Sequence, residues 1–490
     1  MIDKHSPVPI YYQIKQLIRR QIEEGILPPG EKLPTEQALC ELYRVSRAPV
    51  RQALLELVQE GYIYRRAGSG TFVAELQKDS SPAVTTIRLL AYDVRWVALL
   101  QEAVRLWNAQ HPEQSVSLDV HMPPQSDFHR LLCAEVGEGK AHDLFSMDYV
   151  WLTRYARMGF LLAVDEVDSD FAAWLRLNIE PPVLESNLVD GRLYGLPVQT
   201  DVTGLWYRRD WFAAEGLSAP QSWDDLLAVL AHLARPEVKA RYGYEAPLAF
   251  PTSTQAGEAT FNVLLPFLWG AGATIQATDE GMRWDSEPLS RGLHFLQRLT
   301  QTPGWLPEGH AQQSWWGPPG MLAEGRVAMT FGGTYEWPTI AETSGWEGEE
   351  DLLSHLAFVP APRPDLSVAP VASLGGTTLG LSRQSENPAL VLSILRLALD
   401  PVIALPFFLR ELQIAPLRPL NERLLADPHP WLETIIPLLD IARSRPQLMD
   451  YIQFSRLMQL MIEEVLCEGV APEVAMRQTS KTLSILFSKL

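Results

Sequence analysis

The chain has 490 residues, of which 47% are hydrophobic and 20% charged, and its formal net charge is −18. A chain of this length exceeds a single hydrophobic core, so two or three domains are expected, and its composition is that of a globular protein. Three scattered cysteines, Cys40, Cys133 and Cys467, argue against a disulfide framework and a cysteine-ligated structural zinc, and they suit a reducing compartment.

The apolar segments of the chain predict neither a signal peptide nor a membrane-spanning helix. The first residues, MIDKHSPVPIYYQ, lack the apolar run of a signal peptide. The longest apolar stretch, residues 389–409, contains Arg396, Asp400, Pro401 and Pro406, which predicts a buried core helix followed by a turn. We therefore expect a cytoplasmic protein that does not enter a membrane.

Charge and tryptophan are unevenly placed along the chain. Residues 1–78 carry 11 Lys and Arg against 9 Asp and Glu, a net charge of +2, which leaves −20 for the remainder. All 15 tryptophans lie beyond residue 95. Two chemically different modules are therefore expected in one chain.

The first module, residues 1–76, has the pattern of three helices and a hairpin. Apolar residues recur at helical spacing over 10–25, where Gly25 ends the helix. Thr35 is the expected N-cap of a second helix, and Ser46 that of a third running to about Glu60. The segments YIYRR and TFVAE predict two strands around the turn AGSG. This order is typical of a winged helix, an α+β fold whose third helix reads the major groove of DNA.

Two arginines favour an anionic partner for this module. Arg47 and Arg51 are four residues apart and so share one face at the start of the third helix. Cations at a helix N-terminus oppose the helix dipole, so local stability does not explain them. A winged helix can also serve as a protein–protein module, and an arginine pair can simply be a solvated face; both alternatives stay open on shape alone.

The segment GEKLPTEQALCELYRVSRAPVRQALLELVQEGYIYRRAGSGTFV resembles the GntR family of bacterial transcription regulators over about 70 residues. The blocks LPTE, VSRAPVRQAL and GSGTFV stand in the family's order and spacing, although Gln37 replaces an arginine that often follows the first block. Because one module buries little surface, useful affinity would require a homodimer on a pseudo-palindromic operator. By this resemblance, the residues that contact double-stranded DNA would be Thr35, Arg47, Pro49, Arg51, Arg65, Arg66, Gly68, Ser69 and Gly70.

A polar linker, residues 77–86, separates this module from residues 87–490. The following segments TIRLLAY, VALLQEAVRLWNAQHP and SVSLDVHM predict a strand, a helix stopped by Pro112, and a strand. That alternation indicates an α/β domain with a mostly parallel sheet.

An enzyme fused to the DNA module is the first alternative for this large domain. Many GntR-type chains of this length carry an aminotransferase-like domain, in which a lysine forms a Schiff base with pyridoxal phosphate. Beyond residue 78 the chain has only Lys140, Lys239, Lys481 and Lys489, and none lies where the cofactor lysine would be expected. No catalytic motif or paired-cysteine metal motif appears either, so we expect no enzyme, cofactor or metal.

Four other blocks, within residues 143–167, 191–233, 324–338 and 373–399, resemble the family 1 extracellular solute-binding proteins, the receptors of sugar ABC transporters. The resemblance implies a two-lobed α/β fold of the type II periplasmic-binding-protein class, with a small-molecule ligand, expected to be a sugar, in the cleft between lobes. The chain would cross between lobes near residues 196–206 and 370–382. The candidate ligand-binding residues are Asp148, Trp151, Thr200, Asp201, Trp206, Trp269, Tyr335, Glu336, Trp337, Gly376 and Thr377.

Several of these candidates have a structural alternative. Trp206 and Trp269 stand in apolar runs and are as consistent with core packing as with a ligand contact. The segment SWWGPPG (314–320) is either a rim loop of the ligand site or a rigid surface turn.

Together the two resemblances predict a ligand-responsive, sequence-specific transcription regulator that senses a sugar or oligosaccharide and controls genes of carbohydrate uptake or utilisation. The alternative is a carbohydrate-binding protein of an ABC transporter with a vestigial N-terminal module, which would bind sugar but not DNA.

Overall fold

The structure is a computed structural model that describes residues 10–23, 25–59, 61–66, 69–75, 84–93, 95–124, 127–278, 281–427 and 429–487. The chain divides into two compact units. Unit 1 comprises residues 1–147, 155–169 and 379–399; unit 2 comprises residues 148–154, 170–378 and 400–490. Most of the predicted linker, 77–86, lies outside the described residues, and its last two positions already belong to the first strand of the large domain.

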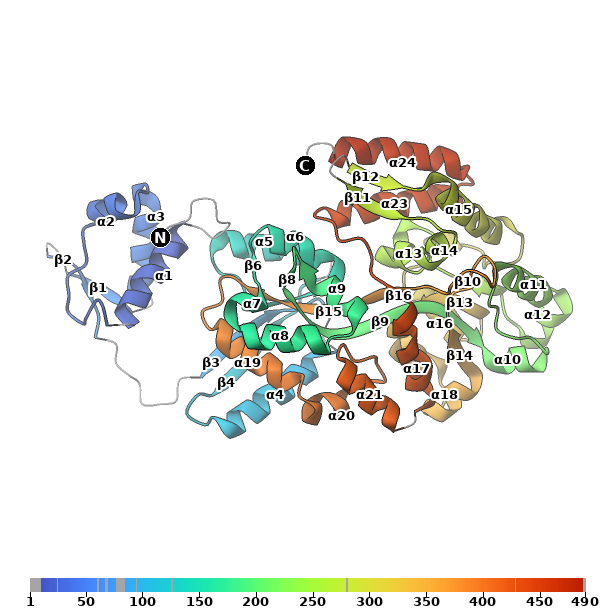
Figure 1. Cartoon of the computed structure of the whole chain (residues 1–490), viewed down its shortest axis with the longest axis horizontal. Helices are drawn as coiled ribbons and strands as arrows, with labels where there is room; N and C mark the ends of the chain where they lie inside the picture. Colours follow the sequence, from blue (N-terminus) through green and yellow to red (C-terminus); the bar gives the residue numbers. More distant parts are fainter. Residues whose placement is uncertain are drawn as a thin grey trace. The chain divides into compact units, whose positions relative to one another are not determined.

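Residues 10–73 form the predicted three helices and hairpin (Figure 1). The helices are α1 (Ile10–Glu23), α2 (Glu36–Tyr43) and α3 (Arg47–Gln59), and the strands are β1 (Ile63–Arg66) and β2 (Gly70–Val73). Their helical spacing brings apolar side chains onto one shared core, since one face of each helix is apolar. The buried residues of this core are Ile14, Ile18, Ile22, Leu33, Leu39, Val50, Ala53, Leu54, Leu57, Ile63 and Val73.

The α/β part of unit 1 is built on a short parallel sheet. Strand β3 (Thr85–Leu90) pairs in parallel with β4 (Val116–His121) and with β5 (Leu144–Asp148). The strand order is β15-β5-β3-β4, so β4 is an edge strand. Helix α4 (Val97–Gln110) packs on α19 (Pro388–Ala398). The other elements are α5 (Phe128–Glu138), β6 (Leu161–Leu162), α7 (Val164–Val167) and α6 (Leu152–Arg157), whose first three residues are assigned to unit 2.

The sheet of unit 2 is mixed, whereas the alternation of strands and helices predicted a mostly parallel one. Strand β9 (Gly195–Arg208) runs antiparallel to β13 (Val327–Gly333) and β14 (Leu356–Val359), while β10 (Ala246–Ala249) is parallel to β13. Alternation indicates that crossovers exist but does not fix the direction of each strand. Strand β15 (Ala372–Ser382), which pairs with β16 (Ala442–Arg443), follows β9 in the order β10-β13-β9-β15.

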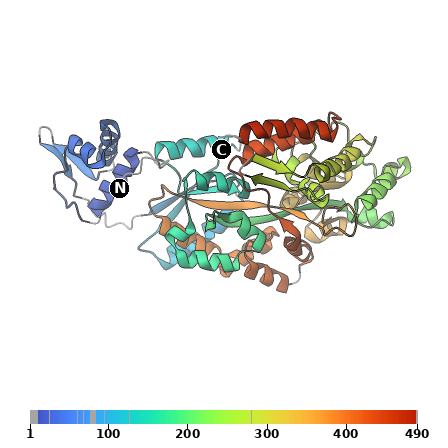
Figure 2. The ribbon, with the colours of Figure 1, turned by 45° about the horizontal axis from the view of Figure 1, so that its top comes forward.

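Helices surround this sheet and complete unit 2. Figures 1 and 2 show α23 and α24, near the C-terminus, beside α15 and the β11–β12 hairpin, and contacts join these elements. The helices are α8 (Ser169–Asn178), α9 (Pro181–Asn187), α10 (Arg209–Ala214), α11 (Trp223–Leu233), α12 (Pro236–Tyr242), α13 (Glu258–Asn262), α14 (Leu265–Gly270), α15 (Ser286–Gln301), α16 (Gly317–Ala323), α17 (Trp337–Ser344), α18 (Glu349–His355), α20 (Pro401–Glu411), α21 (Arg418–Ala426), α22 (Pro430–Ile435), α23 (Tyr451–Leu466) and α24 (Pro472–Phe487). The short strands are β7 (Leu188–Val189), β8 (Arg192–Leu193), β11 (Ile275–Thr278) and β12 (Gly281–Trp284).

The long apolar stretch 389–409 forms two helices instead of one helix and a turn. Helix α19 ends at Ala398, and Asp400 then caps α20 by accepting a hydrogen bond from the backbone N–H of Val402 at 2.8 Å. Within the described residues, no single helix is long and apolar enough to cross a membrane; α19 and α20 meet that criterion only as a bent pair, by length and composition.

The chain passes between the units at positions that only partly match the predicted crossings. The expected crossing at 370–382 contains the division between Thr378 and Leu379, whereas residues 196–206 lie wholly within unit 2. The helices before β9 are already tied to unit 2, because Ile179 forms a β-bridge with Leu417 and the hydroxyl of Thr378 donates to Asn187 Oδ1 at 2.6 Å.

Candidate functional site

The winged helix presents cations from two of its elements, α3 and β1. Arg47 is the first residue of α3, and its side chain is 78% exposed. Arg51 lies one helical turn further on and is also exposed. Arg65 is exposed on β1, and the guanidinium of Arg66 lies over the ring of Phe72. These side chains are accessible to a polyanion.

A carboxylate that the sequence analysis did not single out links two of these cations. Glu36, the first residue of α2, accepts a hydrogen bond from Arg47 Nε at 3.1 Å, and its other oxygen lies 3.7 Å from Arg65 Nη2. The side chain of Glu36 is only 23% exposed. Glu36 therefore holds two predicted DNA-contacting arginines together and competes with any phosphate for them.

The remaining predicted DNA-contacting residues have structural roles that the structure makes visible. The Thr35 hydroxyl caps α2 by accepting from the backbone N–H of Ala38 at 3.2 Å, and Pro49 is half-buried in the first turn of α3. Gly70 has φ +124°, a backbone conformation that favours glycine, and the end of the Lys32 side chain lies close beside it. Ser69 is exposed at the hairpin turn, and Gly68 lies outside the described residues.

Seven of the predicted ligand-binding residues of unit 2 lie in or directly after the strands β5, β9, β13 and β15. Asp148 ends β5, Thr200 and Asp201 lie in β9, Tyr335 and Glu336 follow β13, and Gly376 and Thr377 lie in β15. The hydroxyl of Tyr149 ties β9 to this region by donating to the backbone oxygen of Gln199 at 2.6 Å. A Cβ at Gly375 would lie 2.2 Å from Asp201 Oδ1, and one at Gly376 would lie 2.6 Å from the hydroxyl of Tyr149. Because these two glycines lack a Cβ, the side chains of Asp201 and Tyr149 can approach the backbone of β15 closely.

The strongest electrostatic feature of unit 2 is a buried arginine between two carboxylates. Arg445 Nη2 donates to Asp148 Oδ1 at 2.6 Å, and Nη1 donates to Glu258 Oε1 at 2.9 Å. Tyr451 and Ser455 of α23 also donate to Glu258. Burial by itself lowers the pKa of Arg445, but Asp148, Tyr451 and Glu258 together hold that pKa above its usual value. Asp148, Glu258, Arg445, Tyr451 and Ser455 form what we call the charged cluster.

All four predicted ligand-facing tryptophans pack into the core or against its edge in this structure. Trp206 is fully buried, stacks on Trp431 at 4.9 Å between ring centroids, and donates from Nε1 to the backbone oxygen of Gly333. Trp337 stacks on the same Trp431 at 4.5 Å and is 6% exposed. Trp151 is partly buried against the core of unit 2. The ring of Trp431 covers those of Trp206 and Trp337, so these two are core residues here and do not offer an open stacking surface.

The fourth, Trp269, is 7% exposed, and the guanidinium of Arg443 lies 4.9 Å from its ring centroid. A more accessible aromatic pair stands next to Glu336: Tyr335 and Trp315 are both half-buried, with ring centroids 6.3 Å apart. Trp315 belongs to the segment SWWGPPG, whose next residue, Trp316, is 56% exposed. The rings of Tyr335 and Trp315 are less buried than those of Trp206 and Trp337.

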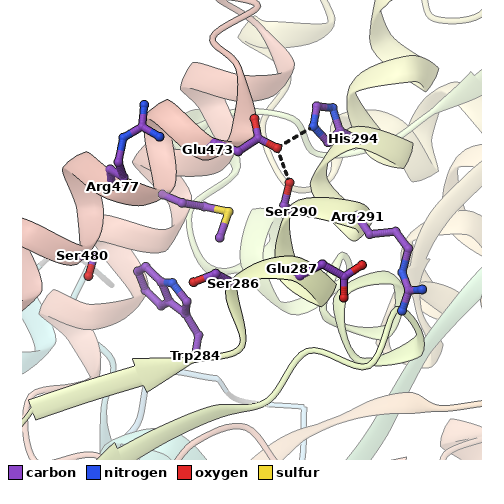
Figure 3. A pocket seen from close by; sticks show the side chains of 10 residues that line it. Trp284, Ser286, Glu287, Ser290, Arg291, His294, Glu473, Arg477 and Ser480 are labelled. Carbon is purple, nitrogen blue, oxygen red and sulfur yellow. Dashed lines mark hydrogen bonds and ion pairs between the residues drawn. The ribbon is translucent and has the colours of Figure 1, made fainter.

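A separate groove of unit 2 is lined by β12, α15 and α24 and contains none of the predicted ligand-binding residues (Figure 3). Glu473 accepts hydrogen bonds from Ser290 and, at 2.8 Å, from His294 Nε2. These contacts, with that of Ser290 the largest, lower the pKa of Glu473 to about 2. These neighbours on α15 thus stabilise Glu473 in its ionised form, and the contacts join α15 to α24.

Two known protein families match this chain, each over a different part of it. A family described as "Bacterial regulatory proteins, gntR family" matches residues 10–73, and a family described as "Bacterial extracellular solute-binding protein" matches residues 93–402, more than half of the chain. The chain belongs to the bacterial extracellular solute-binding protein family and carries a GntR-family domain. Both predicted resemblances, and the predicted winged helix followed by a two-lobed α/β fold, are confirmed.

Individual relatives match the GntR domain alone. The HTH-type regulator YurK of Bacillus subtilis is 51% identical over 73 residues, 15% of this chain and 30% of that protein. The repressor NagR of the same species is 50% identical over 74 residues, again 15% and 30%. The arabinose metabolism transcriptional repressor of Geobacillus stearothermophilus is 40% identical over 87 residues, 18% of this chain and 24% of the repressor. The chain thus spans no more than 30% of the length of these relatives.

Solved structures match the solute-binding-protein part. A solute-binding protein of Thermotoga lettingae bound to α-D-tagatose has a TM-score of 0.67 at 20% identity and covers 82% of this chain and 100% of its own. The GacH receptor of Streptomyces glaucescens, solved unliganded and with acarbose, has a TM-score of 0.69 at 17% identity, with coverages of 83% and 99%. At these identities the likeness establishes the fold of the solute-binding-protein part.

Proposed function

We propose that this protein is a ligand-responsive, sequence-specific DNA-binding regulator that works in the cytoplasm and senses a sugar or oligosaccharide through unit 2. The observation that carries the proposal is the joining of a GntR-family domain and a solute-binding-protein domain in one chain. The GntR relatives include repressors of sugar metabolism, and the structural relatives include sugar-bound proteins. The target genes would then serve carbohydrate uptake or utilisation.

DNA would be read by α3 and the hairpin. Arg47 and Arg51 project from the start of α3, where major-groove base edges are reached in helix-turn-helix proteins. Arg65, Arg66 and the turn at Ser69 and Gly70 would contact the backbone or the minor groove. A single module of this kind buries about 600–1,000 Å² of protein surface, so a homodimer on a pseudo-palindromic operator is proposed.

The ligand would bind beside the charged cluster of unit 2. Carboxylates such as Asp148 and Asp201 can accept hydrogen bonds from sugar hydroxyls, and the Tyr335 and Trp315 rings can lie against the C–H faces of a sugar. The side chain of Glu258, which is 33% exposed, is tied to the same arginine as Asp148. A polar ligand could therefore exchange hydrogen bonds with the cluster without uncovering a lone charge.

The position of these residues in the chain supports coupling to the DNA module. Asp148 directly follows Met147, the last residue of one segment of unit 1, and Thr377 stands two residues before Leu379, where the chain returns to unit 1. Ligand contacts there would act on the connections between the units. The change in DNA affinity must equal the ligand's differential affinity for the two states, typically about 1–3 kcal/mol.

The test uses the full chain. Duplexes selected by the protein from a random pool are titrated at fixed salt, with and without maltose or tagatose, and sugar binding is followed by tryptophan fluorescence. A selected sequence bound with an affinity that shifts about 5- to 150-fold with sugar supports the proposal. Sugar binding without any DNA binding would instead favour the transport-linked binding protein, and DNA binding indifferent to every sugar would refute the sensing role.

A further inference from the structure

Three side chains with metal-ligating atoms converge in unit 1, and none of them is a predicted DNA-contacting residue or a member of the charged cluster. His121, Glu135 and His142 each offer one such atom, and these atoms all lie within 4.8 Å of one another. His142 Nδ1 lies 2.6 Å from Glu135 Oε2, and the ring centroids of the two histidines are 5.7 Å apart. His142 is buried, Glu135 is half-buried, and His121 is exposed.

We propose that His121, Glu135 and His142 form a binding site for a divalent transition-metal ion, with Zn²⁺ the best match. Imidazole nitrogen suits zinc, copper, iron and nickel, and a carboxylate oxygen is a common third ligand. Zinc frequently takes three protein ligands and one water molecule. A metal could not be expected from the sequence, because these three residues include no paired cysteines and follow no local metal-binding spacing.

Two of the three ligands are held in place by the turn between α5 and β5. The backbone N–H of Lys140 donates to the backbone oxygen of Glu135 at 2.9 Å, and that of Ala141 donates to Gln384 Oε1 at 3.1 Å. Arg88 directs its guanidinium to the backbone oxygens of Lys140 and Ala141, and its backbone oxygen accepts from the N–H of Asp143 at 2.9 Å. The guanidinium of Arg88 is thus bound by the turn. The turn therefore holds the backbone of Glu135 and His142 in place, with both side chains on the same site.

The third ligand stands where it can move. His121 is the last residue of the edge strand β4, and its backbone oxygen accepts from the N–H of Ala91 at 2.9 Å. Its side chain is exposed, so it can turn without disturbing a core. Ligand atoms about 2.0–2.2 Å from a tetrahedral zinc are about 3.4 Å apart, so the present separations of up to 4.8 Å require a closure of about 1.4 Å. Rotation of the exposed imidazole supplies that movement.

The structural alternative is an ion pair between His142 and Glu135. That pair accounts for two of the three residues but gives no role to the second imidazole beside them. A bound cation accounts for all three, since it would join both imidazoles and the carboxylate. The two interpretations differ in what they require of His121, which makes this residue the one to test.

The experiment uses the untagged full chain after treatment with EDTA. Co²⁺ serves as the spectroscopic probe, because its visible absorption reports the coordination geometry, and Zn²⁺ affinity is measured by competition against a chromophoric chelator. One ion per chain is expected, together with a rise in the melting temperature when Zn²⁺ is added, because a ligand that binds the folded state stabilises it. His121→Ala and Glu135→Gln should each weaken binding about 10-fold or more.

His111→Ala is the matched control, since His111 lies in unit 1 and stacks on Trp107, outside the cluster. Its metal affinity should equal that of the unchanged protein. His121→Ala removes an exposed side chain and should fold normally, as checked by circular dichroism. No binding of Zn²⁺ or Co²⁺ to the unchanged protein, or stoichiometric binding that persists in His121→Ala, would overturn the proposal.

Discussion

Arg47 Nε lies 3.1 Å from a carboxylate oxygen of Glu36, so the first residue of α3 is held to the first residue of α2. The same carboxylate lies 3.7 Å from Arg65 of the hairpin. Glu36 thus organises the predicted DNA-contacting surface and at the same time lowers its positive charge. Two opposing effects on DNA binding follow, and substitution can separate them.

Glu36→Gln should bind DNA about 2- to 5-fold more tightly, because exposed ion pairs of this kind are worth about 0.2–1 kcal/mol and the freed arginines become available to phosphates. Glu41→Gln, on the same helix, is the matched control for the change in net charge. The dissociation constants are measured at several salt concentrations. Equal gains in both variants would attribute the effect to overall charge and remove the specific role of Glu36.

Arg51→Ala should weaken binding to the selected operator by about 1–3 kcal/mol if Arg51 contacts a base, and its discrimination against unrelated DNA should fall. If Arg51 contacts a phosphate, binding weakens uniformly and the salt dependence is reduced by about one ion. Arg105→Ala, an exposed arginine outside the winged helix, is the control. Unchanged affinity at fixed salt would remove Arg51 from the interface.

Arg445→Met should destabilise the protein by about 3–5 kcal/mol, because it leaves Asp148 and Glu258 without their buried counter-charge. Adding Asp148→Asn and Glu258→Gln to the same chain should recover most of the loss. Arg410→Met, which removes an exposed arginine paired with Glu411, should cost less than about 1 kcal/mol. Urea unfolding measures all four proteins; a triple variant as unstable as Arg445→Met would show that charge is not the cause.

Trp337→Ala should destabilise unit 2 by about 3–5 kcal/mol, since it opens the stack that Trp337, Trp431 and Trp206 form in the core. Trp316→Ala, at a residue that is 56% exposed, should change stability little. A loss of sugar response in Trp337→Ala would therefore reflect altered packing. Trp315→Ala is the better probe of ligand contact, and it should weaken sugar binding while the melting temperature stays close to that of the unchanged protein.

Glu336→Gln should alter how stability depends on pH. Glu336 is 1% exposed, Oε2 lacks a hydrogen-bond partner in the described part of the chain, and burial raises its pKa well above the usual 4.5. Above pH 4.5 the unfolded chain releases a proton that the folded state keeps, so the free energy of unfolding falls as pH rises toward the folded pKa.

The glutamine variant lacks this loss. Its stability relative to the unchanged protein should therefore increase with pH between about 5 and 8, by at most about 1.4 kcal/mol per pH unit. Urea unfolding of both proteins across that range measures the difference. Parallel curves would mean that Glu336 ionises in the folded protein as it does in the unfolded chain.

What could be predicted from the sequence was local. The helices α1 to α3 were predicted from the spacing of apolar residues, and the start of α2 was predicted from Thr35 as its N-cap. The three helices and the cap lie where they were expected. The charged cluster could not be predicted in the same way. Arg445 is separated from Glu258 by 187 positions and from Asp148 by 297, so no spacing in the sequence connects them.

Residue type was also a poor guide to exposure. Trp206 and Trp337 have the chemistry of a sugar-stacking surface, yet a third indole, Trp431, covers them. Trp431 lies far along the chain and belongs to none of the four resembling blocks. Whether an aromatic ring faces a ligand depends on which distant side chain packs against it, and that is set by the tertiary fold.

The charged cluster also has a consequence for engineering. The solute-binding-protein family matches up to residue 402, a natural place to cut when building hybrid sensors from interchangeable parts. Arg445 and Tyr451 come from the segment beyond that point. A hybrid that exchanged residues 93–402 alone would replace Asp148 and Glu258 but keep Arg445 and Tyr451, which contact them in this protein. The segment to exchange therefore extends through α24. In a library of hybrids cut at residue 402, selection would first favour variants that restore stability and only then variants that bind a new ligand.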